Sequence, residues 1–265
     1  MLKLSTFMQK DGGIRMDRIT KDLYAVRATD CDFGGRLRPD AFFIMMQEGA
    51  EHNASAFGAG HEDMLRRGLF FALARMHVRF FRYPRFGERV LHATWPGVAN
   101  RFFFPRYHTL ALEDGTPLAC AAGLWVTLGT ESRSVVSPAR ANLGFPDTSD
   151  IPAPCEAPMK LPPDLAGEPD ETERRPLYSD YDLNGHVNNT RYIAWLCDAL
   201  GRSAFDDGRA LQELTVSYEK EIRGEGALRQ LLTRSNGAFS YRLLSPEGTR
   251  HFEARGTLTG GNDHV

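Results

Sequence analysis

The order of apolar and polar residues predicts a helix flanked by strands in the first part of the chain. Residues 39–58 are typical of a helix, with Pro39 near the first turn and Gly58 near the end. The Asp114-Gly115 pair marks a turn between two of the strands that follow. Segments with strand character lie at residues 23–29, 69–81, 88–95, 101–113 and 117–128.

The second part of the chain repeats this order. A polar loop leads into a helix-like segment at residues 190–200. Asn236-Gly237 and the run Pro246-Glu247-Gly248 are turn signals between the later segments. The strand-like segments of this part are residues 211–222, 227–235, 238–245 and 249–258.

A segment rich in proline and acidic residues separates the two parts. It runs from residue 137 to about 173 and shows neither the strand nor the helix period, which is typical of a linker. We therefore expect a first half at residues 17–137, a linker at 138–173 and a second half at 174–262.

The two halves match residue by residue, as expected for a duplicated unit. Asp30, Asp32, Gly35, Arg36 and Leu37 match Asp180, Asp182, Gly185, His186 and Val187, each 150 positions later. Val78, Phe80, Arg82 and Tyr83 match Val216, Tyr218, Lys220 and Glu221, each 138 positions later. The shorter separation indicates that the second half has lost residues around its helix. We predict an α+β tandem (double) hotdog fold, in which an antiparallel sheet wraps a central helix in each half.

The amino-acid composition limits which partners the protein can bind and which cell compartment it suits. The chain has 265 residues, with 32 Lys and Arg against 34 Asp and Glu, so no overall basic field indicates nucleic acid or an anionic membrane. The four cysteines are far apart and lack metal-ligand spacing. The first residues contain no apolar signal region. We expect a cytoplasmic protein with no metal, no cofactor and no membrane segment.

The segment SDYDLNGHVNN, residues 179–189, concentrates short polar side chains ahead of the second helix. Helix capping needs only one or two such residues. Asp182, Asn184 and His186 occupy alternate positions and point the same way if the loop is extended. The N–H groups at the start of the helix add a positive dipole end. A dense polar cluster of this kind is suited to surround a reacting carbonyl.

The run DYDLNGHVNNTRYIAW, followed by LTVSYEKEI, resembles the acyl-[acyl-carrier-protein] thioesterase family. Plant and bacterial members carry a D-x-D-x-N-x-H-V-N-N-x-x-Y signature and a downstream Y-x-x-E strand. The first half agrees as well, because DCDFGGRL, MMQEGAEHNASAFGAG, FRYPRFGE and TWP occur in the family's order. The resemblance covers residues 20–260 or so.

The resemblance implies that Asp182, Asn184, His186 and Glu221 are catalytic. Thioester hydrolysis needs an activated water and a stabilised oxyanion, and a covalent nucleophile is not required. In our interpretation Glu221 and His186 activate and orient water, Asn184 holds the thioester or the water, and Asp182 orients its neighbours. Which group takes the proton stays open. Plant relatives have Cys after the downstream Glu, but Ile222 stands here, so a Cys–His mechanism is unsupported.

The first half has lost this chemistry, with Gly34, Arg36 and Tyr83 at the positions of Asn184, His186 and Glu221. It holds 12 of the 17 Phe residues and several Met residues. Part of this set fills the core, and as a group it is suited to line an acyl tunnel. We expect four substrate-binding residues: Met45 and Met46 on the first helix, and Asn188 and Asn189, which also cap the second helix.

The expected partner is an acyl carrier protein that bears a phosphopantetheine-linked acyl chain. Five arginines between Arg75 and Arg89, together with Arg66 and Arg67, would dock this acidic, phosphate-bearing partner, although a solvated strand face explains them as well. The predicted reaction is hydrolysis of the acyl-carrier-protein thioester to free fatty acid. The alternatives are an acyl-CoA thioesterase and a non-hydrolytic acyl-binding or hydratase-like hotdog protein. One chain already contains a pair of hotdogs, so either a monomer or a homodimer is compatible.

Overall fold

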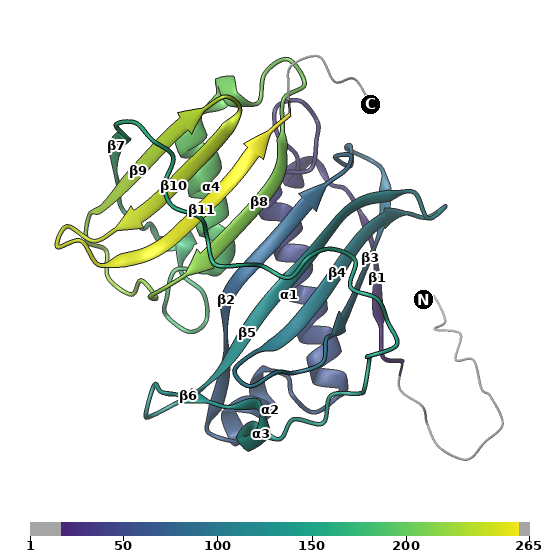
Figure 1. Cartoon of the computed structure of the whole chain (residues 1–265). Helices are drawn as coiled ribbons and strands as arrows, with labels where there is room; N and C mark the ends of the chain where they lie inside the picture. Colours follow the sequence, from purple (N-terminus) through teal and green to yellow (C-terminus); the bar gives the residue numbers. More distant parts are fainter. Residues whose placement is uncertain (1–16, 260–265) are drawn as a thin grey trace.

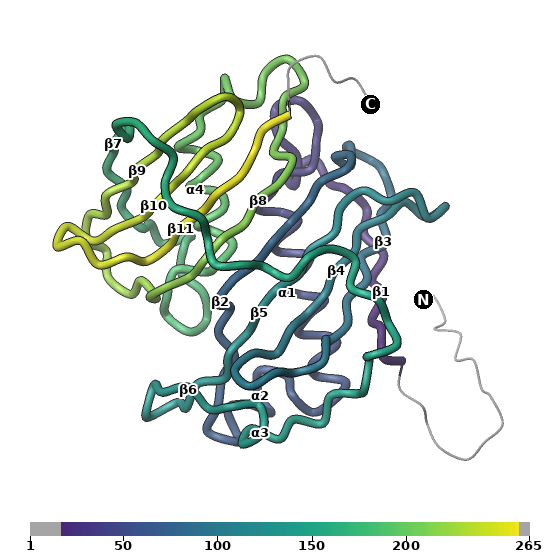
Figure 2. Tube along the Cα trace, viewed as in Figure 1, coloured from purple at the N-terminus to yellow at the C-terminus, as the bar shows by residue number. Residues whose placement is uncertain are grey.

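One continuous antiparallel sheet of eleven strands forms the framework in a computed structural model that describes residues 17–259. Figures 1 and 2 show the two long helices side by side behind this sheet. The strand order is β1-β3-β4-β5-β2-β8-β11-β10-β9-β7, with β6 paired to β5. Residues 260–262 of the predicted second half lie outside the described residues. No helix among residues 17–259 is long and apolar enough to cross a membrane.

The first half, together with the short helix that follows it, contributes six strands, three α-helices and one 3-10 helix. Its strands are β1 (Thr20–Ala25), β2 (Leu69–Phe80), β3 (Arg89–Pro96), β4 (Phe104–Leu112), β5 (Pro117–Gly129) and β6 (Val135–Val136). Its helices are α1 (Pro39–Ala56), α2 (His61–Arg66), α3 (Pro138–Ala141) and the short 3-10 helix η1 (Ala28–Asp30). The predicted strand at residues 23–29 is therefore displaced, because the chain turns into η1 after Ala25.

The second half contributes five strands and one long helix. Its strands are β7 (Asp170–Arg174), β8 (Leu211–Tyr218), β9 (Leu228–Ser235), β10 (Ala238–Leu244) and β11 (Arg250–Leu258). Its helices are α4 (Asn189–Leu200) and the 3-10 helices η2 (Tyr178–Asp180) and η3 (Arg202–Ala204).

The two long helices begin where their sequences predict. Pro39 is the first residue of α1, where its missing N–H costs nothing and its fixed φ suits the helix. The Asn188 side chain caps α4 by accepting a hydrogen bond from the N–H of Thr190 at 2.9 Å. Gly58 follows α1 with φ +65°, a conformation that is accessible to glycine at little cost.

The halves are joined by the pairing of β2 with β8. Met76 pairs with Val216, and Val78 pairs with Leu214. Leu214 is the repeat counterpart of Met76, and Val216 is that of Val78, because each lies 138 positions later. The two pairs are therefore related by the sequence repeat. His77 pairs with its own counterpart Thr215 at the centre, and its Nδ1 lies 2.9 Å from the Thr215 hydroxyl. The duplication has therefore produced a pseudo-two-fold interface inside one chain.

A single hydrophobic core spans both halves. It contains Phe42 and Met46 from α1, Trp195 and Leu196 from α4, and Val78 and Val216 from the joining strands, all at most 2% exposed. This arrangement confirms the predicted α+β tandem hotdog, with the addition that the two sheets are one.

The predicted linker at residues 138–173 is wrong at both ends. Residues 138–141 form α3, and Asp170–Arg174 form β7, which pairs with β9 at the edge of the sheet. Strand β7 was missed because its sequence, DETER, is polar and mostly exposed, which is common for edge strands. It lies 150 positions after β1, so the sequence repeat would have predicted a strand here. The segment between α3 and β7 crosses the face of the sheet opposite the helices (Figure 1).

Helix α1 leaves no room for a side chain at Gly49, which faces the sheet. A Cβ atom at this position would lie 2.5 Å from Cε1 of His92, whose side chain is fully buried on β3. Gly49→Ala should therefore lower the free energy of unfolding by about 1–3 kcal/mol through overpacking. Chemical denaturation measures this loss. Gly224→Ala is the matched control, because nothing lies within 4 Å of a Cβ there, and equal losses in both variants would contradict the close approach.

Candidate active site

The loop that enters α4 has the same backbone as the loop that enters α1. In the second half the N–H of Asp182 donates to the carbonyl of His186 at 2.9 Å, and the N–H of Gly185 donates to the carbonyl of Asp182 at 3.0 Å. Asp32 makes the corresponding bonds 150 positions earlier, at 2.7 Å and 3.0 Å. Gly35 and Gly185 have nearly equal φ angles of +71° and +72°. The two loops therefore differ only in their side chains.

Glu221 lies in an irregular segment that follows β8 and runs beside the loop that enters α4. Strand β8 ends at Tyr218, and three residues later the chain has turned out of the sheet. The carbonyl of the buried Ile222 accepts a hydrogen bond from the N–H of Val187 at 2.8 Å. This bond sets residue 221 beside residue 186. The predicted strand at residues 211–222 is thus too long, because the chain leaves the sheet to make this contact.

His186 lies between two carboxylates. Its Nε2 is 3.0 Å from Oε2 of Glu221, and its Nδ1 is 3.9 Å from Oδ1 of Asp182. Only the first distance is that of a hydrogen bond. The same oxygen of Asp182 accepts a hydrogen bond from the N–H of Asn184 at 2.8 Å and so braces the loop. The structure therefore brings Asp182, Asn184, His186 and Glu221 together, as the sequence predicted.

Two arginines that the sequence did not predict interact with the carboxylate of Glu221. Nε of Arg223 donates to Oε1 of Glu221 at 2.7 Å, and Nη1 of Arg133 lies 3.9 Å from Oε2. Burial raises the pKa of Glu221, but the Arg223 hydrogen bond and the charges of His186, Arg223 and Arg133 lower it below its ordinary value. Arg223 was detectable as a neighbour in sequence. Arg133 comes from the first half, after β5, and no motif marks it.

The start of α4 offers a backbone donor to the site. The N–H of Asn189, the first residue of the helix, forms no hydrogen bond within residues 17–259. The matching position in the first half is Pro39, which has no N–H. Asn188 and Asn189 both line the cavity described below, and Asn188 caps the helix as predicted. Only the second half therefore combines a polar loop with a donor at the helix start.

A cavity of about 690 Å³ connects the polar loop with the first half. Its wall combines both halves, which is typical of ligand sites with a mostly apolar lining and a few polar groups. The second half supplies Asp182, Asn184, His186, Asn189, Tyr218 and Glu221. The first half supplies Gln47, Ala50, Ala54, Met64, Phe70, Phe71, Leu73, Phe104, Arg106, Trp125 and Arg133.

Met45 and Met46, predicted as substrate-binding residues, do not line this cavity. Both are buried in the shared core, at 5% and 2% exposure. Helical geometry explains the result, because Gln47, Ala50 and Ala54 form the stripe of α1 that faces the cavity. The aromatic wall includes Phe145, a residue of the segment read as linker, whose ring is tilted by 36° against that of Phe71 and packs edge to ring with Phe104.

The arginines between residues 75 and 89 are largely paired within the chain. Arg82 bonds Glu88 at 3.1 Å, Arg89 bonds Glu113 at 3.1 Å, and Arg79 lies 3.5 Å from Glu213. Glutamates therefore neutralise much of this predicted docking surface. The pairs are exposed or half-buried, and such pairs contribute little to stability.

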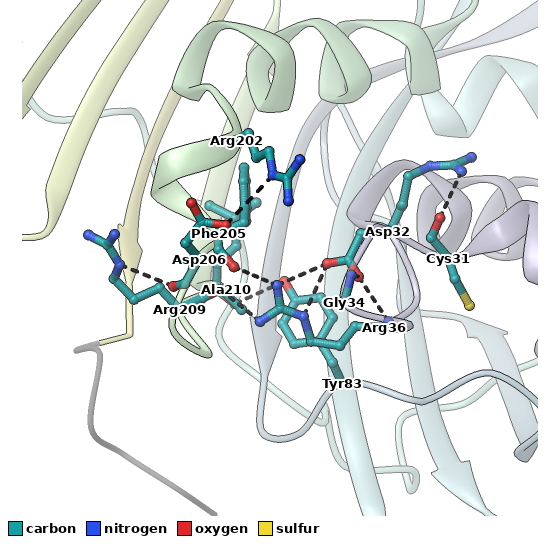
Figure 3. Close-up of polar contacts among 12 residues, drawn as sticks. Cys31, Asp32, Gly34, Arg36, Tyr83, Arg202, Phe205, Asp206, Arg209 and Ala210 are labelled. Carbon is teal, nitrogen blue, oxygen red and sulfur yellow. Dashed lines mark hydrogen bonds and ion pairs between the residues drawn. The ribbon is translucent and has the colours of Figure 1, made fainter.

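The first-half counterpart of the site forms hydrogen bonds that connect the two halves, here called the Arg36 tie. Figure 3 shows Arg36, at the position of His186, between Asp32 and the chain after α4. Its guanidinium bonds Asp32 and donates to the carbonyls of Phe205 at 2.9 Å and Arg209 at 2.8 Å. Tyr83, at the position of Glu221, donates to the carbonyl of Leu211 at 3.0 Å.

Cys197 lies away from Glu221. It is on α4, where it is half-buried and packs against the shared core, and burial raises the pKa of its thiol. A protonated thiol is a weak nucleophile. Ile222, at the position where plant relatives have Cys, is 4% exposed.

The chain matches the models of the two domains of one family. Residues 17–139 match the acyl-ACP thioesterase N-terminal domain, and residues 165–257 match the acyl-ACP thioesterase C-terminal domain. The chain therefore belongs to the acyl-ACP thioesterase family.

Curated relatives and solved structures agree with this assignment. A chloroplastic dodecanoyl-[acyl-carrier-protein] hydrolase of Cinnamomum camphora is 26% identical over 214 residues, which are 75% of this chain and 55% of that protein. The chain thus spans about half the length of such relatives. An acyl-ACP thioesterase structure from Bacteroides thetaiotaomicron gives a TM-score of 0.81 at 20% identity, covering 91% of this chain and 98% of that one. A 12:0-ACP thioesterase from Umbellularia californica gives 0.77 at 22% identity, with 92% and 98% covered.

The Arg36 tie predicts a measurable loss of stability. Arg36→Ala removes the donor to two carbonyls and the partner of the mostly buried Asp32, so the free energy of unfolding should fall by about 1–3 kcal/mol. Chemical denaturation measures this change. Arg202→Ala is the control, because its pair with Asp206 at 3.8 Å is exposed and should contribute little. Equal stability of the Arg36 variant and the wild type would show that the contacts are dispensable.

Proposed function

We propose that the protein hydrolyses the thioester of fatty acyl-[acyl-carrier-protein] and releases free fatty acid. The observation that carries this proposal is the 3.0 Å contact between His186 and Glu221 in the wall of a largely apolar cavity. Membership of the acyl-ACP thioesterase family supports the choice of the thioester.

The Glu221–His186 pair is suited to activate water. Glu221 is ionised at neutral pH, since its pKa lies below the ordinary value of a glutamate. Arg223 and His186 engage its two oxygens and so fix its orientation. The pair takes one proton from water, and the oxygen of that water adds to the thioester carbonyl carbon. The carbon–sulfur bond then breaks, and the leaving thiolate takes a proton. The products are the carboxylic acid and the thiol of the carrier.

The developing oxyanion would be held at the start of α4. The N–H of Asn189 is unpaired within residues 17–259, and it lies at the positive end of a helix of 12 residues. The side chain of Asn184 also forms no hydrogen bond within the described residues and lines the cavity, so it is free to orient the thioester or the water. Asp182 keeps the loop in shape and faces Nδ1 of His186.

The first half would hold the acyl chain. Phe71, Phe104, Phe145 and Trp125 form an aromatic wall, with Met64 and Ala54 beside it. Such a wall is suited to an alkyl group. Family membership favours the carrier protein over CoA as the thiol. A cytoplasmic location and assembly as a monomer or homodimer stay predictions.

Loss of either member of the pair should abolish most of the turnover. His186→Ala and Glu221→Gln should each lower kcat by about a hundredfold or more while the fold is retained. Release of fatty acid from several acyl-carrier-protein and acyl-CoA substrates measures turnover and identifies the preferred thiol. Cys197→Ser is the control and should leave turnover intact. Near-normal turnover of either pair variant removes that residue from the mechanism.

Arg223 should set the acid limb of the pH–rate profile. Its hydrogen bond lowers the pKa of Glu221, so activity that needs the carboxylate is present above that pKa and is lost as pH falls through it. Arg223→Ala should raise this pKa and move the acid limb of kcat/KM to higher pH. Arg229→Ala is the control, because it breaks a similar half-exposed pair with Glu171 at 2.6 Å, outside the cavity lining. An unmoved acid limb in the Arg223 variant would refute this role.

A further inference from the structure

A buried cation lies in the wall of the acyl cavity. Arg106 on β4 is 6% exposed and lines the cavity beside the aromatic wall. Its guanidinium carbon lies 5.8 Å from the ring centre of Phe145. A cavity that served only alkyl chains would have no use for a charge at this place, because burying one is costly.

The partners of Arg106 are neutral. Its Nη1 donates to Oδ1 of Asn53 at 2.9 Å and lies 3.4 Å from the hydroxyl of Thr94. None of the ion pairs among residues 17–259 includes Arg106, and the nearby Glu51 instead accepts from the N–H of His61 at 2.8 Å. Burial lowers the pKa of Arg106 to about 10, so the group is still charged at neutral pH.

The cavity side of Arg106 retains unused donors. Within residues 17–259, its Nε and Nη2 groups form no hydrogen bond. These two groups are also not fully buried, since neither is among the buried polar atoms that lack a partner in that part of the chain. They therefore retain some accessible surface, and Arg106 is one of the residues that line the cavity. Asn53, fully buried, donates to the hydroxyl of Thr20 at 3.0 Å and so holds the guanidinium in place. Oε1 of Gln47, also in the cavity wall, is buried and has no hydrogen-bond partner among residues 17–259.

We propose that Arg106 makes this cavity selective for acyl chains that carry a hydrogen-bond acceptor, a hydroxyl, oxo or carboxylate oxygen, near their distal end. The proposal rests on the proposed thioesterase function and adds the substrate class. An acceptor at this depth satisfies the free N–H groups of Arg106. A plain alkyl chain that reaches the same depth removes water from these donors and leaves them unpaired, which is costly. Short plain chains that stop before Arg106 escape this penalty.

The test compares matched thioesters on the purified full-length chain. Octanoyl-, decanoyl- and dodecanoyl-carrier-protein are each compared with the same chain bearing a terminal hydroxyl or a terminal carboxylate. The wild type should prefer an oxygenated chain by about tenfold or more in kcat/KM at the length that reaches Arg106. Arg106→Met should erase this preference and raise activity on the plain chain of that length. Arg106→Lys should retain a preference.

A matched control is Arg255→Met. Arg255 is also largely buried on a strand, but it pairs with Asp164 and does not line the cavity. This variant should keep the wild-type preference. If Arg106→Met does not fold, the wild-type comparison and Arg106→Lys decide the question. Equal kcat/KM for plain and oxygenated chains at every length in the wild type overturns the proposal.

A second readout separates this proposal from the thioesterase function. Calorimetric binding of free decanoic acid, hydroxydecanoic acid and decanedioic acid needs no turnover. Tighter binding of the oxygenated acids, lost in Arg106→Met, supports the role of Arg106 even if no thioester is hydrolysed, and the absence of turnover then refutes only the thioesterase function. Turnover of plain thioesters without any Arg106-dependent preference in binding or kinetics refutes only the role of Arg106.

Discussion

The pairing of β2 with β8 is the constraint on which the rest of the molecule depends. It joins two half-sheets into one, with His77 and Thr215 at the centre of a pseudo-two-fold arrangement. Because the sheet is continuous, α1 and α4 share one core, and the loop of one half meets the cavity of the other. Arg133 from the first half can approach Glu221 from the second only in this geometry.

Duplication has kept the backbone and changed the side chains. Both helix-entry loops make the same hydrogen bonds, with a glycine at the same positive φ. In one loop the position of His186 is occupied by Arg36, whose fixed charge and fork of donors suit carbonyls and a carboxylate. In the other, an imidazole able to exchange a proton faces a carboxylate. Pro39 also removes the backbone donor that Asn189 keeps. The first-half loop therefore holds the two halves together, and the second-half loop keeps the side chains that are suited to catalysis.

The cavity combines two physical demands. An alkyl group gains by leaving water for an aromatic wall, whereas the guanidinium of Arg106 gains only from a polar partner. The aromatic residues come from β2, β4 and β5 and from Phe145 of the crossing segment. Phe145, near the start of the crossing segment, thus contributes to the apolar side of the cavity.

The sequence by itself determined the two long helices, most strands, the duplication and the four polar residues of the candidate site. These features depend on local signals: capping residues, turn residues, periodicity and a contiguous motif. It missed β7, whose polar edge residues lack a strand period. It also did not show that Met45 and Met46 face the core, since the pattern along a helix does not tell which neighbour each face meets. Only the tertiary structure decided that Gln47, Ala50 and Ala54 face the cavity, that Arg133 and Arg223 hold Glu221, and that Arg106 is buried beside an aromatic wall. These are contacts between residues far apart in the chain or between side chains with several possible directions, and packing alone sets them.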